Sequence, residues 1–208
     1  MRLYLASGNK HKQKEMQELL PDYEIRIPAD DALAFDPDET GSSFAENSLI
    51  KARALWDMVH EPVIADDSGL CVDALKGAPG IYTSRYAGPD YVQGRPDGKK
   101  IPQDEQNRLL IEHLNKSGSQ NRACHYTCAM VLLLSPDRYF VAQETFEGQL
   151  IQSIFQAAGS GGFGYDPIVY LPQYQKTVAE ISAEEKNAIS HRGKAVRAIA
   201  ALLRNLHE

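Results

Sequence analysis

The stretch that decides the fold is VIADDSGLCVDALKGAPGIYTSRYAG, residues Val63–Gly88. It begins as a short apolar segment, which predicts a buried strand, and runs directly into two neighbouring aspartates, Asp66 and Asp67. We expect the strand to end there and the chain to turn at Ser68. Five glycines and four prolines then lie between residues 77 and 102, so an irregular excursion follows.

On both sides of this stretch, segments typical of strands alternate with segments typical of helices. Before it come the strand MRLYLAS, the helix KHKQKEMQELL, the weaker strand YEIRI, a polar loop and the helix SFAENSLIKARALWDMVH. After it come the helix QDEQNRLLIEHLNK, two strands joined by the turn SPDR, a glycine loop entering the strand IVYLP, and a helical tail over residues 182–206 that restarts near Ser190. The alternation predicts an α/β protein, and nothing marks a linker, so we expect a single domain over residues 1–208.

Composition excludes several classes of protein. The chain has 208 residues, 43% of them hydrophobic, and a net charge of −6. No run of Lys or Arg exceeds two residues, so we expect no nucleic-acid partner. No apolar stretch reaches about 18 residues, so we expect no membrane span. Three cysteines are an odd number, and Cys124-x-x-x-Cys128 lacks a second pair of metal ligands, so we predict a reduced, cytoplasmic protein.

The adjacent aspartates indicate a charged site. Two carboxylates ~4 Å apart repel each other by ~4 kcal/mol at an effective dielectric constant of about 20. Neighbouring residues on a strand point to opposite faces of the sheet, so either the pair shares a cation or only one aspartate faces the site. The second arrangement needs less strain. A strand-end turn with two solvated carboxylates remains an alternative on this stretch alone.

The segment ASGNKHKQKE predicts a polar turn between the first strand and the first helix. The free N–H groups at a helix N-terminus suit phosphate, and Lys10 and Lys12 add positive charge there. Basic residues early in a helix are otherwise unfavourable, which an anion site would explain. The spacing of a Walker A loop is absent. Solvated lysines on a surface helix remain the alternative.

Three further motifs have a structural and a functional interpretation each. Ser43-x-x-Glu46 fits a capping box, which favours a cap over a metal ligand for Glu46.

The segment GSGGFGYD contains the pattern G-x-G-x-x-G, but it leads into a strand instead of a helix, so we reject a dinucleotide-binding site. Its aromatic residues suit either a flat ligand or the apolar core. Lys186, His191 and Arg192 near the helix restart suit a phosphate or a base edge, or they are surface residues.

Taken together, these motifs supply carboxylates for a hard divalent cation, two helix starts with basic residues, and an aromatic–glycine loop. A nucleoside triphosphate with Mg²⁺ requires these features. The residue chemistry alone therefore predicts metal-dependent phosphate chemistry on a nucleotide, without specifying which bond is cut.

A family resemblance adds the reaction. The blocks SGNKHK, SFAENSLIKA, ADDSGLCVDALKGAPGIYTSRYAG, GGFGYDP and EEKNAISHRGKA resemble the signature blocks of the inosine triphosphate pyrophosphatase family, in family order. The resemblance implies hydrolysis of ITP, dITP and XTP to the monophosphate and pyrophosphate with Mg²⁺. It also implies an elongated mixed β-sheet flanked by helices, two lobes with the active-site cleft between them, and a homodimer.

The resemblance also implies a role for each matching residue. Glu46 and Asp67 match the Mg²⁺ ligands, Asp67 also matches the base that activates water, and Asp66 and Lys51 are supporting residues. The residues implied to bind the nucleotide are Ser7, Gly8, Asn9, Lys10, His11, Lys12, Ser68, Phe163, Gly164, Tyr165, Asp166, Lys186, His191 and Arg192.

Two departures from the family and two alternatives accompany this assignment. Ser7 stands where many members have threonine, and the loop GPDYVQGRPDGKKIPQDEQN is longer than usual. A Maf-type pyrophosphatase with another base preference is one alternative, against which the FGYDP and SHRGKA blocks argue. A non-catalytic nucleotide-binding module is the other, and the presence of both Glu46 and Asp67 argues against it.

Overall fold

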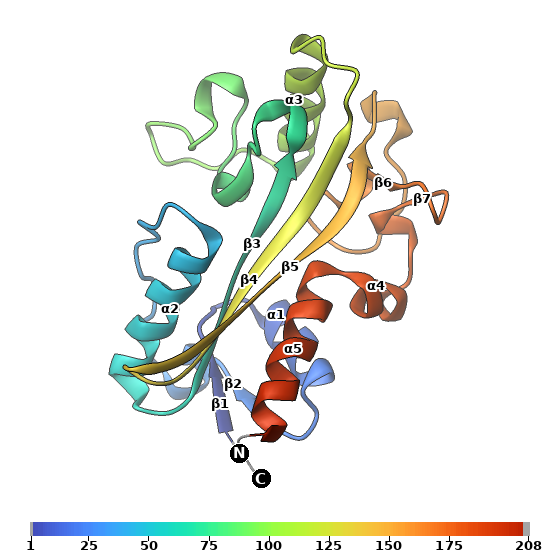
Figure 1. The fold of residues 1–208 in the computed structure, drawn as a ribbon. Helices are drawn as coiled ribbons and strands as arrows, with labels where there is room; N and C mark the ends of the chain where they lie inside the picture. Colours follow the sequence, from blue (N-terminus) through green and yellow to red (C-terminus); the bar gives the residue numbers. More distant parts are fainter. Residues whose placement is uncertain (1, 206–208) are drawn as a thin grey trace. The chain divides into compact units, whose positions relative to one another are not determined.

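The computed structural model describes residues 2–205, and for His11 it describes the backbone alone. Figure 1 shows the helices and strands along the chain. Their bounds are β1 Arg2–Leu5, α1 Lys10–Leu19, β2 Glu24–Arg26, α2 Phe44–Val59, β3 Val63–Val72, α3 Gln103–Lys116, β4 Ala123–Ser135, β5 Arg138–Leu150, β6 Val169–Leu171, β7 Lys176–Thr177, α4 Ala183–Ile189 and α5 His191–Asn205. None of these helices combines the length and the apolar character that crossing a membrane requires.

The strands form one mixed sheet in the order β2-β1-β3-β4-β5-β6-β7. β1 pairs in parallel with β2 and β3, whereas β6 pairs antiparallel with β5 and β7. The α/β class and the mixed sheet predicted from the sequence are therefore confirmed.

The chain divides into two compact units, in agreement with the predicted two lobes. The first unit consists of the described parts of Met1–Asp67, Cys128–Glu144 and His191–Glu208, and the second consists of Ser68–Thr127 and Thr145–Ser190. β3, β4 and β5 each contribute residues to both units. Whether these units count as one domain over residues 1–208 stays a prediction.

In the first unit, helices cover both faces of the sheet. α1 and α5 pack on one face, where Ile64 of β3 joins Met16 and Ile199 in the core. α2 packs on the other face, where Val63 and Ala65 of β3 are buried with its own apolar residues. The side chains of β3 thus alternate between two apolar cores, as the pleat of a strand requires.

β3 is longer than the sequence predicts. It runs for ten residues to Val72, so the prediction that the strand ends at Asp66 and turns at Ser68 is wrong. β1, by contrast, ends at Leu5, which pairs with Ile64. The aspartates therefore lie beyond the carboxyl end of β1, while β3 continues beside the 13-residue strand β4.

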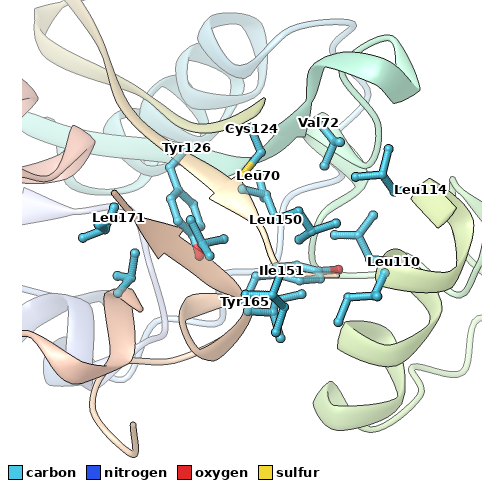
Figure 2. Packing of buried hydrophobic residues seen from close by; sticks show 14 of the residues in the cluster. Leu70, Val72, Leu110, Leu114, Cys124, Tyr126, Leu150, Ile151, Tyr165 and Leu171 are labelled. Atoms are coloured by element: carbon cyan, nitrogen blue, oxygen red, sulfur yellow. The ribbon is translucent and has the colours of Figure 1, made fainter. Parts of the chain in front are cut away.

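The second unit has its own apolar core, shown in Figure 2. Leu70 and Val72 from the far half of β3 meet Leu110 and Leu114 of α3, and all four are fully buried. Burial of the two β3 side chains explains why the strand continues past the charged pair: each buried apolar side chain contributes ~1.5–3 kcal/mol. The glycine loop before β6 enters the same core through Tyr165.

Gly159, in this glycine loop, offers a test of the packing in the second unit. Its φ is +82°, and a Cβ at this position would lie 2.4 Å from the carbonyl carbon and oxygen of Ala179. Gly159→Ala should lower the free energy of unfolding by ~2–5 kcal/mol, because a left-handed conformation and overpacking both contribute. Urea denaturation measures this loss.

The matched control is Gly118→Ala. Gly118 has φ +71° but nothing within 4 Å of its Cβ position, so only the ~1–2 kcal/mol of the left-handed conformation is expected. Equal losses in the two variants would show that the contact with Ala179 does not constrain the loop.

Candidate active site

Asp66 lies at the centre of a buried ion cluster in the first unit. Its side chain accepts hydrogen bonds from Lys12 Nζ at 2.9 and 3.0 Å and from Arg192 Nε and Nη2 at 3.3 and 3.1 Å. Arg192 also donates to Glu15 at 2.9 Å. Residues from α1, β3 and α5 are thereby joined through one carboxylate.

The two cations determine the charge state of Asp66. Burial alone would raise the pKa of its carboxyl, but Lys12 and Arg192 outweigh that effect, and the pKa lies well below its usual range. Burial would likewise lower the pKa of the Arg192 guanidinium, and Asp66 and Glu15 outweigh it and raise the pKa. Asp66 is therefore a permanent anion that holds two cations and is poorly suited to accept a proton.

Asp67 has different partners. Its carboxylate accepts hydrogen bonds from Asn47 Nδ2 at 3.2 Å and from Lys51 Nζ at 3.3 Å, both on α2. Lys51 also donates to Glu39 at 2.8 Å. Burial raises the pKa of Asp67, Lys51 opposes that rise, and Glu39 adds to it, so the carboxylate is more basic than usual.

The opposite-faces argument from the sequence is confirmed. Asp66 meets residues of α1 and α5, and Asp67 meets residues of α2, which cover opposite faces of the sheet. The neighbouring carboxylates therefore have separate positive partners, and only one of them has a raised pKa.

A cavity of about 200 Å³ lies beside these carboxylates, beyond the end of β1. Its lining comes from the loop after β1, from the cationic side chains of Lys12 and Lys51, from Asp66, and from the loop Phe35–Glu39. The lining therefore combines two lysines with three carboxylates, Asp36, Glu39 and Asp66, a mixture that suits a polyanion bound together with a divalent cation.

The loop after β1 leads into the N-terminus of α1, as predicted. Ser7 Oγ accepts from the Asn9 N–H at 3.1 Å, and Asn9 Oδ1 accepts from the Lys12 N–H at 3.4 Å, so Asn9 caps the helix. No acidic residue stands in the first turn. Lys10 is exposed, and the side chain of His11 lies outside what the structure describes.

Glu46 takes the capping position that the sequence favours. Its backbone N–H donates to Ser43 Oγ at 3.2 Å, and its carboxylate accepts from the N–H and Oγ of Ser42 at 2.7 and 2.8 Å. The hydrogen bonds from Ser42 lower the pKa of Glu46. Its assignment as a metal ligand stays a prediction.

The carboxylates near the cavity suit a Mg²⁺ ion that is also bound by substrate phosphates better than a metal ion bound by protein side chains alone. Within residues 2–205, no three His, Cys, Asp or Glu side chains form a cluster that could hold a metal ion. Mg²⁺ usually takes one or two carboxylates and completes its shell with phosphate oxygens and water. Asp67 and Glu39 are two carboxylates near each other, since Lys51 Nζ contacts both.

The second unit contains a separate cluster around Asp166. This carboxylate is 3% exposed and accepts hydrogen bonds from Tyr126 Oη at 3.0 Å, the Phe163 N–H at 2.7 Å and Lys186 Nζ at 2.6 Å. Gly162 fits only without a side chain, because a Cβ there would lie 2.0 Å from Asp166 Oδ2. Asp166 thus fixes both the glycine loop and Lys186.

The Asp166 cluster presents an exposed aromatic ring next to a cation. The Phe163 side chain is 59% exposed, and Lys186 Nζ lies 4.7 Å from its ring centroid. Gly164 accepts from Asn107 Nδ2 at 3.3 Å through its carbonyl, which anchors the loop to α3. An exposed ring held on a fixed loop is a suitable surface for stacking a flat ligand.

The other predicted binding residues have less accessible side chains. Tyr165 is 4% exposed and donates its hydroxyl to the Thr83 carbonyl at 3.0 Å, so its side chain belongs to the core. His191 and Arg192 are buried at the start of α5. Ser68 is half-buried within β3. Their contacts with a nucleotide stay predictions.

Three residues of these clusters were missed by the sequence analysis. Glu39 lies in a loop without periodicity, and its Asp-Glu-Thr-Gly context gives no sign that it meets Lys51. Tyr126 lies in an apolar run, so the sequence indicates only a buried strand residue there. Glu15 looks like an ordinary solvated residue of α1, whereas in the structure it is the second partner of Arg192.

Comparisons with known proteins agree with this arrangement. The model of the Ham1 family matches residues 3–202. A protein of Treponema denticola named dITP/XTP pyrophosphatase is 45% identical over 98% of this chain and 99% of its own length. One of the same name from Streptomyces coelicolor is 44% identical over 99% of this chain and 98% of its own.

Solved structures show the same relationship. A HAM1 protein from Coxiella burnetii superposes with a TM-score of 0.87 at 36% identity, covering 99% of both chains. The Ham1 protein of Staphylococcus aureus gives a TM-score of 0.82, also at 36% identity and 99% coverage of both chains. The resemblance inferred from the sequence blocks is thus confirmed: the chain belongs to the Ham1 family.

Proposed function

We propose that this chain is a Mg²⁺-dependent pyrophosphatase that hydrolyses dITP, XTP and ITP to the monophosphate and pyrophosphate. The name of the relatives, dITP/XTP pyrophosphatase, supports the substrate class. The observation that carries the proposal is the cavity beyond β1, which Lys12 and Lys51 line. Lys51 also contacts Asp67, so phosphate-binding cations stand next to a carboxylate of raised basicity.

The phosphate chain is bound by positive groups of the first unit. Lys12 lines the cavity, and the free N–H groups at the N-terminus of α1 add their partial positive charge. Asp66 and Arg192 hold Lys12 in place, since Asp66 binds both cations. The loop Ser7–Asn9, whose hydrogen bonds fix its shape, brings its backbone against the same phosphates.

Asp67 accepts the proton of the attacking water. Asn47 and Lys51 fix its carboxylate, and burial raises its pKa, which favours proton acceptance. The water attacks the α-phosphorus in line with the bond to the leaving pyrophosphate. Mg²⁺, when bound, would be held by Asp67 with Glu39 or Glu46 and would neutralise charge on the phosphate oxygens.

The base is recognised by the Asp166 cluster of the second unit. The exposed ring of Phe163 stacks on the purine, and Lys186 supplies a donor for the carbonyl oxygen at the purine 6-position. Adenine carries an amino group at that position and would leave the donor unpaired, which discriminates by up to ~10⁴-fold in sites of this kind. The fixed position of Lys186 against Asp166 supports this role.

We also propose a homodimer, on the strength of the family resemblance. Of the three tyrosines Tyr82, Tyr86 and Tyr91, Tyr86 is fully buried, whereas Tyr91 is 44% exposed and is available for a contact between two copies.

The reaction predicts a specific product pattern. With Mg²⁺ present, dITP and XTP should be cleaved at least ~10²-fold faster than dATP or CTP, because only the former carry the 6-carbonyl purine. The products should be a nucleoside monophosphate and pyrophosphate, separated by ion-exchange chromatography. Release of orthophosphate and a diphosphate would mean that another bond is cut.

Substitutions of Asp66 and Asp67 should have different effects, the first on stability and the second on catalysis. Asp67→Asn should lower kcat at least ~10²-fold, because it removes the base. It should leave the free energy of unfolding unchanged or higher, because a raised pKa means that the folded state disfavours the ionised carboxylate. Asp66→Asn should instead lower the free energy of unfolding by ~3–5 kcal/mol, because it removes the anion shared by the buried Arg192 and the half-buried Lys12 and leaves Arg192 with Glu15 alone.

Initial rates with dITP and urea denaturation of both variants measure these effects. An Asp67→Asn enzyme that keeps more than about a tenth of the parent kcat, a loss below the lower bound for base catalysis, would remove Asp67 from this role.

The second metal ligand can be identified with matched substitutions. Glu39→Gln and Glu46→Gln each remove one charge without changing size. If Glu39 is the ligand, its variant needs at least ~10-fold more Mg²⁺ for half-maximal activity, as for loss of one metal-supporting group. Glu46→Gln should then alter mainly the stability of the first turn of α2, because it weakens the hydrogen bonds from Ser42. The reverse pattern in a Mg²⁺ titration would assign the ligand to Glu46.

A further inference from the structure

The first turns of α3 bury an amide where its later turns bury leucines. Leu110 and Leu114 belong to the apolar core of the second unit, whereas Asn107, one turn before Leu110, is 6% exposed. A buried amide is costly unless it is hydrogen-bonded. Asn107 Nδ2 donates to the carbonyl of Gly164 at 3.3 Å, and Asn107 Oδ1 accepts from Gln103 Nε2 at 3.0 Å. Asn107 thus links α3 to the glycine loop.

The residue that Asn107 holds is the pivot of a tight turn. The Phe163 carbonyl accepts from the Asp166 N–H at 3.3 Å, which closes the turn Phe163–Asp166. The φ angles of its two central residues are +64° at Gly164 and −86° at Tyr165. These values fit a type II′ turn, which favours glycine at the first central position. The carbonyl of Gly164 takes no part in the hydrogen bond that closes the turn, so it is available to Asn107.

Packing does not restrain Gly164. A Cβ at this position would have nothing within 4 Å. Within residues 2–205, the hydrogen bond from Asn107 is the one that Gly164 makes. The next residue, Tyr165, is anchored separately, because it is buried in the same cluster as Leu110 (Figure 2) and its hydroxyl donates to the Thr83 carbonyl at 3.0 Å. Asn107 therefore restrains the part of the turn that the core does not.

The exposed ring of Phe163 depends on this restraint. Phe163 directly precedes Gly164, and its side chain is 59% exposed, so the backbone rather than the core determines where the ring lies. Asp166 holds the Phe163 N–H at 2.7 Å, but both groups belong to the same turn and move with it. A second attachment, to α3, is needed to fix the direction in which the ring is presented.

We infer that Asn107 is a positioning residue for recognition of the base. It acts through Gly164, by holding the turn Phe163–Asp166 so that the Phe163 ring is presented for stacking. Gln103, one turn earlier on α3, orients the amide: its donor occupies Asn107 Oδ1, which leaves Nδ2 to face Gly164. The inference deepens the proposed function and rests on it, because stacking of the purine on Phe163 is part of that proposal.

Kinetics on dITP test this role. Asn107→Leu removes both hydrogen bonds at similar size, and Asn107→Asp keeps the acceptor for Gln103 but removes the donor to Gly164. Each should raise KM by ~10-fold, the usual effect of one lost hydrogen bond. The value of kcat should stay within ~2-fold, as for loss of an interaction made equally in ground and transition states. Gln103→Leu should raise KM only ~2-fold, because it removes an exposed helix pair.

Asn115→Leu is the matched control. Asn115 lies two turns further along α3, and its Nδ2 donates to the Gln152 carbonyl at 3.0 Å, so it makes the same kind of link from the helix to a loop. That loop does not carry Phe163. The control should therefore lose stability but keep KM for dITP within ~2-fold of the parent. A purely structural role for Asn107 would give both variants the same kinetics.

Hydrogen exchange tests the restraint without any nucleotide. In the free protein, amides of the segment 160–165 should exchange faster in Asn107→Leu than in the parent, because the turn opens more often. They should exchange at the parent rate in Asn115→Leu. Mass spectrometry of peptides that cover this segment measures both variants.

The outcomes separate this inference from the proposed reaction. If the parent releases pyrophosphate from dITP but the Asn107 variants keep its KM, or lose kcat instead, the positioning role is overturned and the reaction stands. Unchanged exchange of the segment 160–165 in Asn107→Leu likewise overturns the role. A parent that releases no pyrophosphate from dITP overturns the proposed reaction and the role in base recognition together, while the exchange rates still decide whether Asn107 holds the turn.

Discussion

The structure of the first unit depends on one constraint: two adjacent aspartates on a single strand must each be neutralised on a different face of the sheet. The pleat sends Asp66 toward α1 and α5 and Asp67 toward α2. Each carboxylate then recruits its own cations, Lys12 and Arg192 for the first and Lys51 for the second. The three helices that form the two apolar cores are thereby also the helices that supply the charged groups of the site.

The separation gives two chemically different carboxylates from one sequence pair. A carboxylate between two cations stays ionised and serves as a fixed anchor, whereas one that is buried beside a single shared cation retains basicity. Lys51 is central to this difference because Glu39 competes with Asp67 for it. If both carboxylates lay on one face of the sheet, they would repel each other or share a proton.

The sequence predicted the elements whose pattern is local. α2 follows from helical periodicity and its capping serine, Ser43. α3 follows from its helical pattern alone, and the β4–β5 hairpin follows from two apolar runs around a short turn. The opposite faces of Asp66 and Asp67 followed from strand geometry. The length of β3 did not, because the apolar residues that extend it, Leu70 and Val72, are bounded by a charged pair that looks like a strand end.

Contacts between distant segments escaped prediction for a physical reason. Tyr126 and Asp166 are 40 residues apart, and a tyrosine in an apolar strand carries no mark of the carboxylate that it will meet. Glu39 belongs to an irregular loop, so its neighbour on α2 is fixed only by the folded chain. Family resemblance identified the loop around Phe163 and named Asp166 as a nucleotide-binding residue, but it did not show that this buried carboxylate holds the loop in place.

The link between Arg192 and Glu15 has a consequence for biosynthesis. These residues are 177 positions apart, and Asp66 and Arg192 are 126 apart. While the ribosome is making the chain, Lys12 precedes Asp66, but Arg192 follows it by 126 residues. Until Arg192 has been added, Asp66 has only one of its two cationic partners. A chain cut short before Arg192 would leave Glu15 and Asp66 without the guanidinium that they share, and the ion cluster that joins α1, β3 and α5 could not form.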